Sequence, residues 1–123
     1  MNFYPPPPTI TAELHVRIPD DKRCLGEDTE WKGGSANKFK HIFLEGPVAD
    51  ADGNIFVVDI PYGRVLQIDA QKQVTECCRW DGEPNGLAGT KDGNLLVADY
   101  KQVSFIPRGQ SPPEYIYRGF SRG

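Results

Sequence analysis

The sequence contains no apolar run of the length that a membrane-spanning helix requires, which is about 20 residues. Its first residues lack the basic start and the apolar core of a secretory signal. An excess of one charge is also lacking, because the formal net charge is −3 and the lysines and arginines are scattered along the chain. We therefore expect a cytoplasmic protein that binds neither a membrane nor a nucleic acid.

Residues that commonly bind metals or act as nucleophiles are few. The chain has three cysteines, Cys24, Cys77 and Cys78, and two histidines that are far apart, His15 and His41. This spacing builds neither a disulfide framework nor a Cys-x-x-Cys metal knuckle, so we expect reduced thiols, with one of the adjacent pair buried. We expect both histidines to be surface or half-buried residues. The sequence also lacks a Gly-x-Ser-x-Gly elbow, a Walker loop and a His-Glu-x-x-His motif.

What the sequence does contain is a stretch that occurs twice. Residues 45–60 and 85–100 align without a gap, 40 positions apart. In each copy Asp-Gly-Asn supplies the positive-φ residue that a two-residue hairpin turn needs, and an apolar run follows it. Each copy therefore predicts a strand, a tight turn and a second strand. The identical positions are Gly46/Gly86, Asp52/Asp92, Gly53/Gly93, Asn54/Asn94, Val57/Val97 and Asp59/Asp99.

Further strands complete each unit. In the first unit they are expected over 64–69, after a turn at 61–63, and over 73–80, after a turn at 70–72. Four short antiparallel strands in about 40 residues are typical of a propeller blade. In the second unit the match decays after Tyr100, but 114–118 is a credible fourth strand. The predicted fold is all-β, a β-propeller fragment of two four-stranded antiparallel blades over 43–82 and 83–123.

The preceding residues, 1–42, are expected to form an N-terminal arm. The four prolines at 5–8 favour an extended polyproline conformation, more often a stiff arm than a ligand for an aromatic groove. Residues 9–18 alternate between apolar and polar types, which predicts a strand. Residues 20–40 are polar apart from Trp31, and we expect an irregular connection with a helical turn over 20–25.

Two blades cannot close a ring, which needs roughly four or more. Each blade buries its faces only against neighbouring blades, so two units leave two apolar faces open. A third unit would begin just past Gly123. The sequence therefore indicates either a piece of a longer propeller or a chain that assembles with copies of itself. The loss of repeat register after Tyr100 favours a truncated product and argues against evolved self-complementarity.

Glu45 and Asn85 are the candidate metal ligands. They are equivalent residues at the start of the innermost strand of each unit, and in a propeller such residues point at the central channel. Carboxylate and amide oxygens are the hard donors that calcium prefers. The alternative is a solvated residue at Glu45 and a turn former at Asn85, which composition alone favours. Asp59 and Asp99 end the second strands, and we expect them to bond backbone amides rather than to do chemistry.

Several of these motifs resemble the regucalcin (senescence-marker-protein)/gluconolactonase family. Leu44-Glu45-Gly46-Pro47, the hairpin over 52–60 and Gly63-Arg64-Val65 look like its first blade. The segments 84–87 and 92–100 look like the second blade of its gluconolactonase-like branch. The resemblance covers residues 43–101, and Glu-Gly-Pro at the head of the first blade is its most specific element.

The resemblance implies a six-bladed propeller with one divalent ion, usually calcium, in the central channel. It also implies hydrolysis of a small-molecule lactone whose carbonyl the ion polarises. By that likeness Glu45 is a metal ligand and Asn85 a second one, while the catalytic residues stay unknown because the family takes its base from later blades. The first hypothesis is a lactone hydrolase relative that is inactive as a lone monomer. The alternative is a non-catalytic binding or assembly module, a homo-oligomer in which three copies complete the ring.

Overall fold

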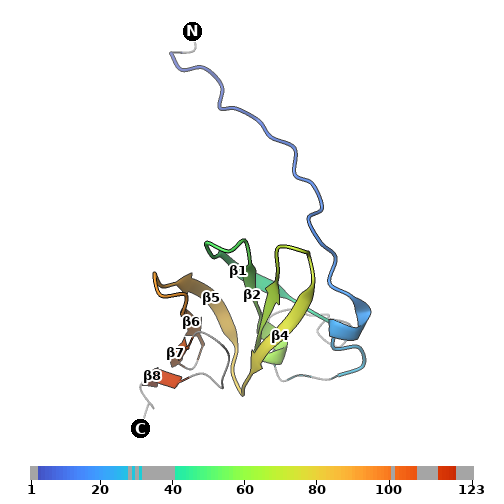
Figure 1. The fold of residues 1–123 in the computed structure, drawn as a ribbon, viewed down its shortest axis with the longest axis vertical. Helices are drawn as coiled ribbons and strands as arrows, with labels where there is room; N and C mark the ends of the chain where they lie inside the picture. Colours follow the sequence, from blue (N-terminus) through green and yellow to red (C-terminus); the bar gives the residue numbers. More distant parts are fainter. Residues whose placement is uncertain are drawn as a thin grey trace.

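The computed structural model describes residues 3–27, 29, 31, 41–100 and 102–107 in full and residues 114–118 as backbone. These residues form two antiparallel sheets of four strands each, and within each sheet every strand pairs with the one that follows it in the chain. The protein is all-β over the described residues, as predicted (Figure 1). The described part has no helix long and apolar enough to cross a membrane. The first sheet contains β1 (Leu44–Ala49), β2 (Ile55–Asp59), β3 (Arg64–Ile68) and β4 (Val74–Arg79), and the second contains β5 (Pro84–Gly89), β6 (Leu95–Asp99), β7 (Gln102–Ile106) and β8 (Glu114–Arg118).

The hairpin turns after β1, β3 and β5 share one geometry. In each, the first residue donates its amide to the carbonyl of the residue four positions on. The residue before that acceptor has a positive φ: 84° at Gly53, 65° at Lys72 and 79° at Gly93. These are three-residue loops with a left-handed last residue. The expectation of two-residue turns was wrong, because the loop also includes the residue before Asp-Gly and a side chain closes its base. The closing bonds run from the amides of Asn54, Gln73 and Asn94 to the side chains of Asp50, Asp69 and Thr90, at 2.9, 2.8 and 3.1 Å.

The two sheets repeat one another beyond the point where the sequence match fades. Val58 pairs with Val65 in the first sheet, and Ala98 pairs with Val103 in the second. Four residues separate β2 from β3, but two separate β6 from β7. The residues of β7 therefore lie 38 positions after their counterparts in β3, whereas those of β6 lie 40 positions after their counterparts in β2. A deletion of two residues in this connection explains why the match decayed after Tyr100.

Two apolar cores hold the molecule together. The inter-sheet core lies between the facing sides of the two sheets, and its buried members are Val58, Val65, Leu95, Val97 and Ile106. The outer core covers the other side of the first sheet, where an N-terminal residue joins strand residues: Ile18, Val57, Leu66, Ile68 and Val74.

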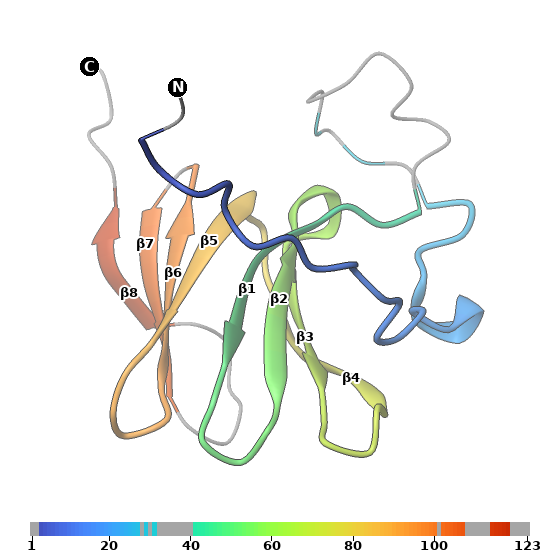
Figure 2. The same cartoon turned by 90° about the horizontal axis from the view of Figure 1, so that it is seen from above.

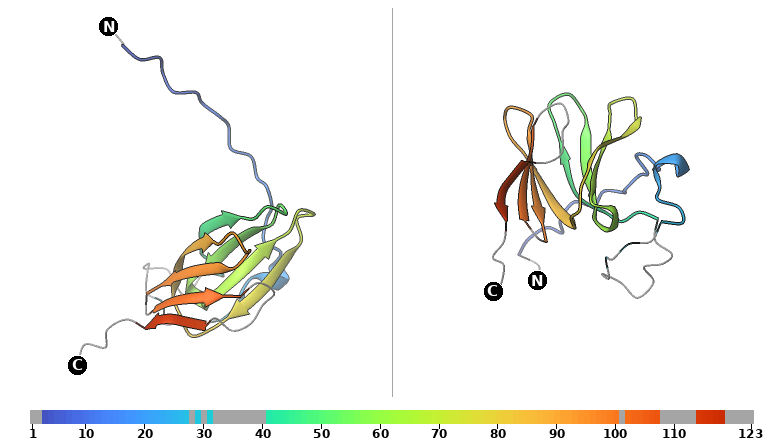
Figure 3. Two further views of the ribbon diagram at one scale, coloured as in Figure 1. Left: turned by 60° about the vertical axis from the view of Figure 1, so that its left-hand side comes forward. Right: turned by 90° about the horizontal axis from the view of Figure 1, so that it is seen from below.

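The N-terminal arm departs from the sequence prediction. Residues 9–18 form no strand, and the arm runs away from the sheets (Figures 1 and 3). Ile10 is 95% exposed and Leu14 is 82% exposed, whereas Ile18 is buried. The alternation was real, but an extended segment becomes a strand only when a neighbouring strand satisfies its backbone groups. The predicted helical turn is present as η1 (Asp20–Lys22), and the rest of the expected connection beyond Trp31 lies outside the described residues.

Candidate functional site

The first strands of the two sheets, β1 and β5, lie side by side at the middle of the molecule (Figure 2). Their backbones touch at Gly46 and Gly86. A Cβ on Gly46 would lie 2.9 Å from the Gly86 Cα and 2.9 Å from the Leu87 nitrogen, closer than real Cβ atoms approach. Gly46 also has a φ of 57°, a conformation that favours glycine. The repeated glycine thus lets two irregular strand starts meet.

This contact brings the candidate ligands Glu45 and Asn85 to neighbouring strands. Glu45 precedes Gly46, and the Asn85 carbonyl oxygen would be 3.2 Å from a Cβ on Gly46. Both residues are exposed. Each stands where the pairing of its strand is irregular, since the register shifts after Glu45 in β1 and between Pro84 and Gly86 in β5. The two residues thus lie on neighbouring strands, but the pairing differs at the two positions, because Glu45 pairs with Val58 whereas Gly86 pairs with Ala98, the counterpart of Val58.

The two side chains do not make a calcium site on their own. Calcium takes about six to eight oxygen ligands. Glu45 offers a carboxylate and Asn85 an amide oxygen, and the described residues contain no group of three or more His, Cys, Asp or Glu side chains able to hold a metal. The donors are of the right type but too few to hold a calcium ion.

Asp59, expected to bond backbone amides, does so and also forms an ion pair. Its Oδ1 accepts a hydrogen bond of 2.8 Å from the Phe43 amide, which ties the entry of β1 to the end of β2. Its Oδ2 accepts a hydrogen bond of 2.8 Å from Arg64 Nε. Burial raises the pKa of Asp59, against the opposing effects of the Phe43 amide and of Arg64. The role of this aspartate is structural.

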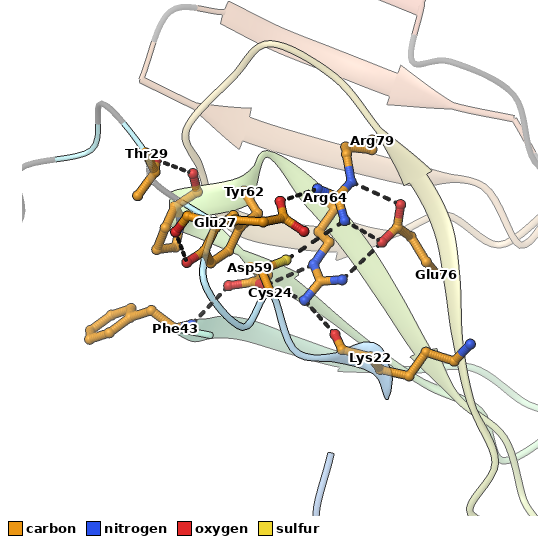
Figure 4. Close-up of polar contacts among 11 residues, drawn as sticks. Lys22, Cys24, Glu27, Thr29, Phe43, Asp59, Tyr62, Arg64, Glu76 and Arg79 are labelled. Atoms are coloured by element: carbon orange, nitrogen blue, oxygen red, sulfur yellow. Dashed lines mark hydrogen bonds and ion pairs between the residues drawn. The ribbon is translucent and has the colours of Figure 1, made fainter. Parts of the chain in front are cut away.

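An ionic cluster on the outer side of the first sheet is the most elaborate polar feature (Figure 4). Arg64 bridges Asp59 and Glu76, with Nη1 2.9 Å from Glu76 Oε2. Arg79 holds the same carboxylate through two bonds, Nε to Oε1 at 3.0 Å and Nη2 to Oε2 at 2.8 Å. The hydrogen bonds from Arg79, then those from Arg64, lower the pKa of Glu76 to about 2 despite partial burial. Two arginines and two carboxylates thus balance in charge.

The same arginines bind the segment that follows the arm (Figure 4). Arg64 Nη2 donates to the Lys22 carbonyl at 2.7 Å. Arg79 reaches Glu27 Oε2 at 3.4 Å and Cys24 Sγ at 3.7 Å. This cluster was not predicted from the sequence, although Arg64 and Glu76 lie in predicted strands. A charged residue within a predicted strand, five positions after Asp59, was the available signal.

Asp99 has a different partner from its counterpart Asp59. Its Oδ2 accepts a hydrogen bond of 2.9 Å from the indole nitrogen of Trp80, which follows β4 of the first sheet. This bond leaves no room for a side chain at Gly82, since a Cβ there would lie 2.2 Å from both of the bonded atoms. The bond therefore joins the two sheets.

The three thiols are free, and the two of the adjacent pair are not activated as nucleophiles. The three cysteines are free, Cys24 buried and Cys77 and Cys78 both half-buried, so neither of the adjacent pair is fully enclosed. Burial raises the pKa of Cys77 and of Cys78 to about 11, which keeps both thiols protonated and weakly nucleophilic. His15 is exposed and His41 half-buried, as expected.

A cleft of about 580 Å³ opens between the hairpin turns of β1–β2 and β5–β6. It lies at the far ends of β1 and β5 from Glu45 and Asn85, and neither of these lines it. The Asp50 carboxylate and the Thr90 hydroxyl on its wall already accept hydrogen bonds within their own turns. The cleft has an apolar floor of Val48, Phe56, Leu95, Ile106 and Pro107.

No protein-family model, curated protein or solved structure matches this chain.

Proposed function

We propose that the two sheets are neighbouring blades of a β-propeller related to the lactone hydrolases of the regucalcin/gluconolactonase family. The observation that carries the proposal is the contact of Gly46 with Gly86. The first strands of the two sheets lie against each other there, which is the arrangement expected of inner strands around a shared axis. The motif Leu44-Glu45-Gly46-Pro47 supports the family assignment.

The way the sheets pack supports the same proposal. One side of the first sheet, represented by Val58 and Val65, covers the opposite side of the second sheet, represented by Leu95 and Val97. Consecutive four-stranded units that stack in this manner, each on the next, are the building principle of a propeller. A sandwich formed by a two-fold arrangement would bring equivalent sides together instead.

As a single copy, the chain neither hydrolyses lactones nor binds calcium tightly. Glu45 and Asn85 supply two oxygen side chains of the about six to eight ligands that calcium takes. When bound in a complete ring, the ion would supply Lewis-acid polarisation of a lactone carbonyl. The contribution of this chain would be to hold two of the ligands at the axis, with the remaining donors coming from further sheets.

Calcium titration and lactone hydrolysis together test this function. For the purified chain we expect no saturable calcium binding below the millimolar range, and lactone hydrolysis at the uncatalysed rate with or without calcium. Glu45→Gln and the control Glu13→Gln, which changes an exposed carboxylate of the arm, should both behave as wild type. Calcium-dependent hydrolysis that Glu45→Gln abolishes and Glu13→Gln preserves would refute the inactivity of a single copy, and it would support Glu45 as a metal ligand.

A second candidate function is assembly without catalysis. The side of the second sheet that faces away from the first carries apolar residues, of which Ala98 and Val103 are exposed. An apolar sheet face of this kind is what an additional blade would cover.

A further inference from the structure

The segment over residues 16–27 packs on the outer side of the first sheet, against β2, β3 and β4. We name residues 16–27 the N-terminal strap. Ile18 is buried against Val57, Leu66, Ile68 and Val74, and Val16 packs at the edge of the same core. At its other end the strap is held by the bond from Arg64 to the Lys22 carbonyl and by the contacts of Arg79 with Cys24 and Glu27.

The same side of the second sheet is covered by a sheet instead. Leu95, Val97 and Ile106 occupy the positions that correspond to Ile55, Val57 and Ile68 of the first sheet. In the second sheet these residues pack on Val58 and Val65. The strap thus covers the same side of the first sheet that the first sheet covers on the second.

The side of the second sheet that faces away from the first corresponds to the side of the first sheet that packs in the inter-sheet core. Leu96, Ala98, Val103 and Phe105 correspond to Phe56, Val58, Val65 and Gln67 of the first sheet, by the pairing of their strands. Val58 and Val65 form the inter-sheet core. Ala98 and Val103 are exposed, and Leu96 and Phe105 are half-buried. Among the described residues, one side of the second sheet is therefore exposed and one side of the first sheet is covered by the strap. The counterparts of these two sides pack against each other in the inter-sheet core.

We infer that the N-terminal strap is an intramolecular cap that blocks head-to-tail self-assembly of the chain. Its competitor is the exposed side of β6 and β7 of a second copy, which would cover the first sheet as the first sheet covers the second. The inference rests on the proposed function, since it treats each sheet as a blade. Because the competing interface would repeat one already present within the chain, it needs no change in either sheet.

The test compares full-length variants by sedimentation velocity over a range of concentrations, with circular dichroism to confirm sheet content. The wild type should sediment as a monomer. Ile18→Asp places a charge in the outer core and should release the strap, so that the weight-average mass rises at least twofold with concentration. Leu14→Asp is the matched control, because Leu14 is 82% exposed and lies just before the strap, and this variant should stay monomeric. Adding Val103→Asp to Ile18→Asp should restore the monomer, because the exposed side of the second sheet is then charged.

Three results would overturn the inference: an oligomeric wild type, a folded Ile18→Asp variant that stays monomeric, or oligomers that Val103→Asp leaves intact. If Ile18→Asp loses its sheet signal, Ile18→Ala decides instead, since it weakens the cap without burying a charge. A monomeric Ile18→Ala variant whose arm is cleaved faster by protease would likewise refute it. None of these results depends on calcium or lactones, so failure here is separate from failure of the proposed function.

Discussion

Arg64 and Asp59 form an ion pair across β2 and β3, with Nε and Nη2 of the arginine each 2.8 Å from the Asp59 Oδ2 atom. The Arg64 side chain is 2% exposed and that of Asp59 is 0% exposed, so water screens neither. The planar guanidinium also lies over the Tyr62 ring, with Cζ 5.9 Å from the ring centroid. In the second sheet the corresponding residues are Asp99 and Gln102, and the pair is absent.

Arg64→Met should destabilise the fold by about 3–5 kcal/mol, because it leaves the Asp59 carboxylate buried without its counter-charge. Arg23→Met is the control: its ion pair with Asp20 spans 3.2 Å at the surface and should contribute less than about 1 kcal/mol. The double variant Asp59→Leu/Arg64→Met should recover part of the loss, since both charges are then removed together. Urea unfolding measures all three, and an Arg64→Met variant as stable as Arg23→Met would contradict the assignment.

The free energy of unfolding should decrease in acid, and part of that decrease should come from protonation of Glu76. Its pKa in the folded protein is lowered to about 2, chiefly by hydrogen bonds from Arg79. The stabilisation is present above the unfolded pKa, near 4.5, and is lost as the pH falls towards 2. Asp59, whose pKa is raised by burial, contributes with the opposite sign. The free energy of unfolding of Glu76→Gln should therefore depend less on pH between 5 and about 2 than that of wild type. Parallel curves for the two proteins would exclude this role.

The turn geometry predicts opposite effects of substitutions at equivalent positions. Lys72 has a φ of 65° and should prefer glycine, so Lys72→Gly should stabilise by about 0.5–1 kcal/mol. Gly53, with a φ of 84°, has space for a Cβ, the nearest side-chain atom being 3.5 Å away. Gly53→Ala should therefore lose about 1 kcal/mol through backbone strain alone. Thermal unfolding of the two variants measures the difference, and a shift of the same sign in both would contradict the prediction.

Alanine substitutions at Gly46 and Gly26 distinguish the cost of backbone strain from the cost of disturbing the contact between the sheets. Gly26 has a φ of 78° and no atom within 4 Å of a Cβ, so Gly26→Ala should cost about 1 kcal/mol from strain. Gly46→Ala adds the clash with Gly86 and Leu87 to a similar strain, and should cost about 2–4 kcal/mol. Chemical denaturation compares them directly. Equal losses would mean that β1 and β5 do not meet at Gly46 in solution.

The repeat over 45–60 and 85–100 was sufficient to predict the first two strands of each unit and the position of the turn between them. Its signals are local: a glycine at a positive-φ position and an alternating apolar run specify a hairpin without reference to the rest of the chain. The two-residue displacement of β7 was not predictable in the same way. A shift by two residues leaves each side chain on the same face of a strand, so the apolar alternation looks equally good in either register.

The sequence by itself determined an all-β chain of two similar units and the equivalence of Glu45 with Asn85, because those features depend on residues close together in the chain. Only the tertiary structure decided that Ile18 caps the first sheet, that Arg64 and Asp59 are buried beneath that cap, and that residues 9–18 pair with no strand. Each of these depends on which surfaces lie against one another across many intervening residues. A pattern of apolar positions predicts that a residue will be buried, but which segment buries it depends on the packing of the whole chain.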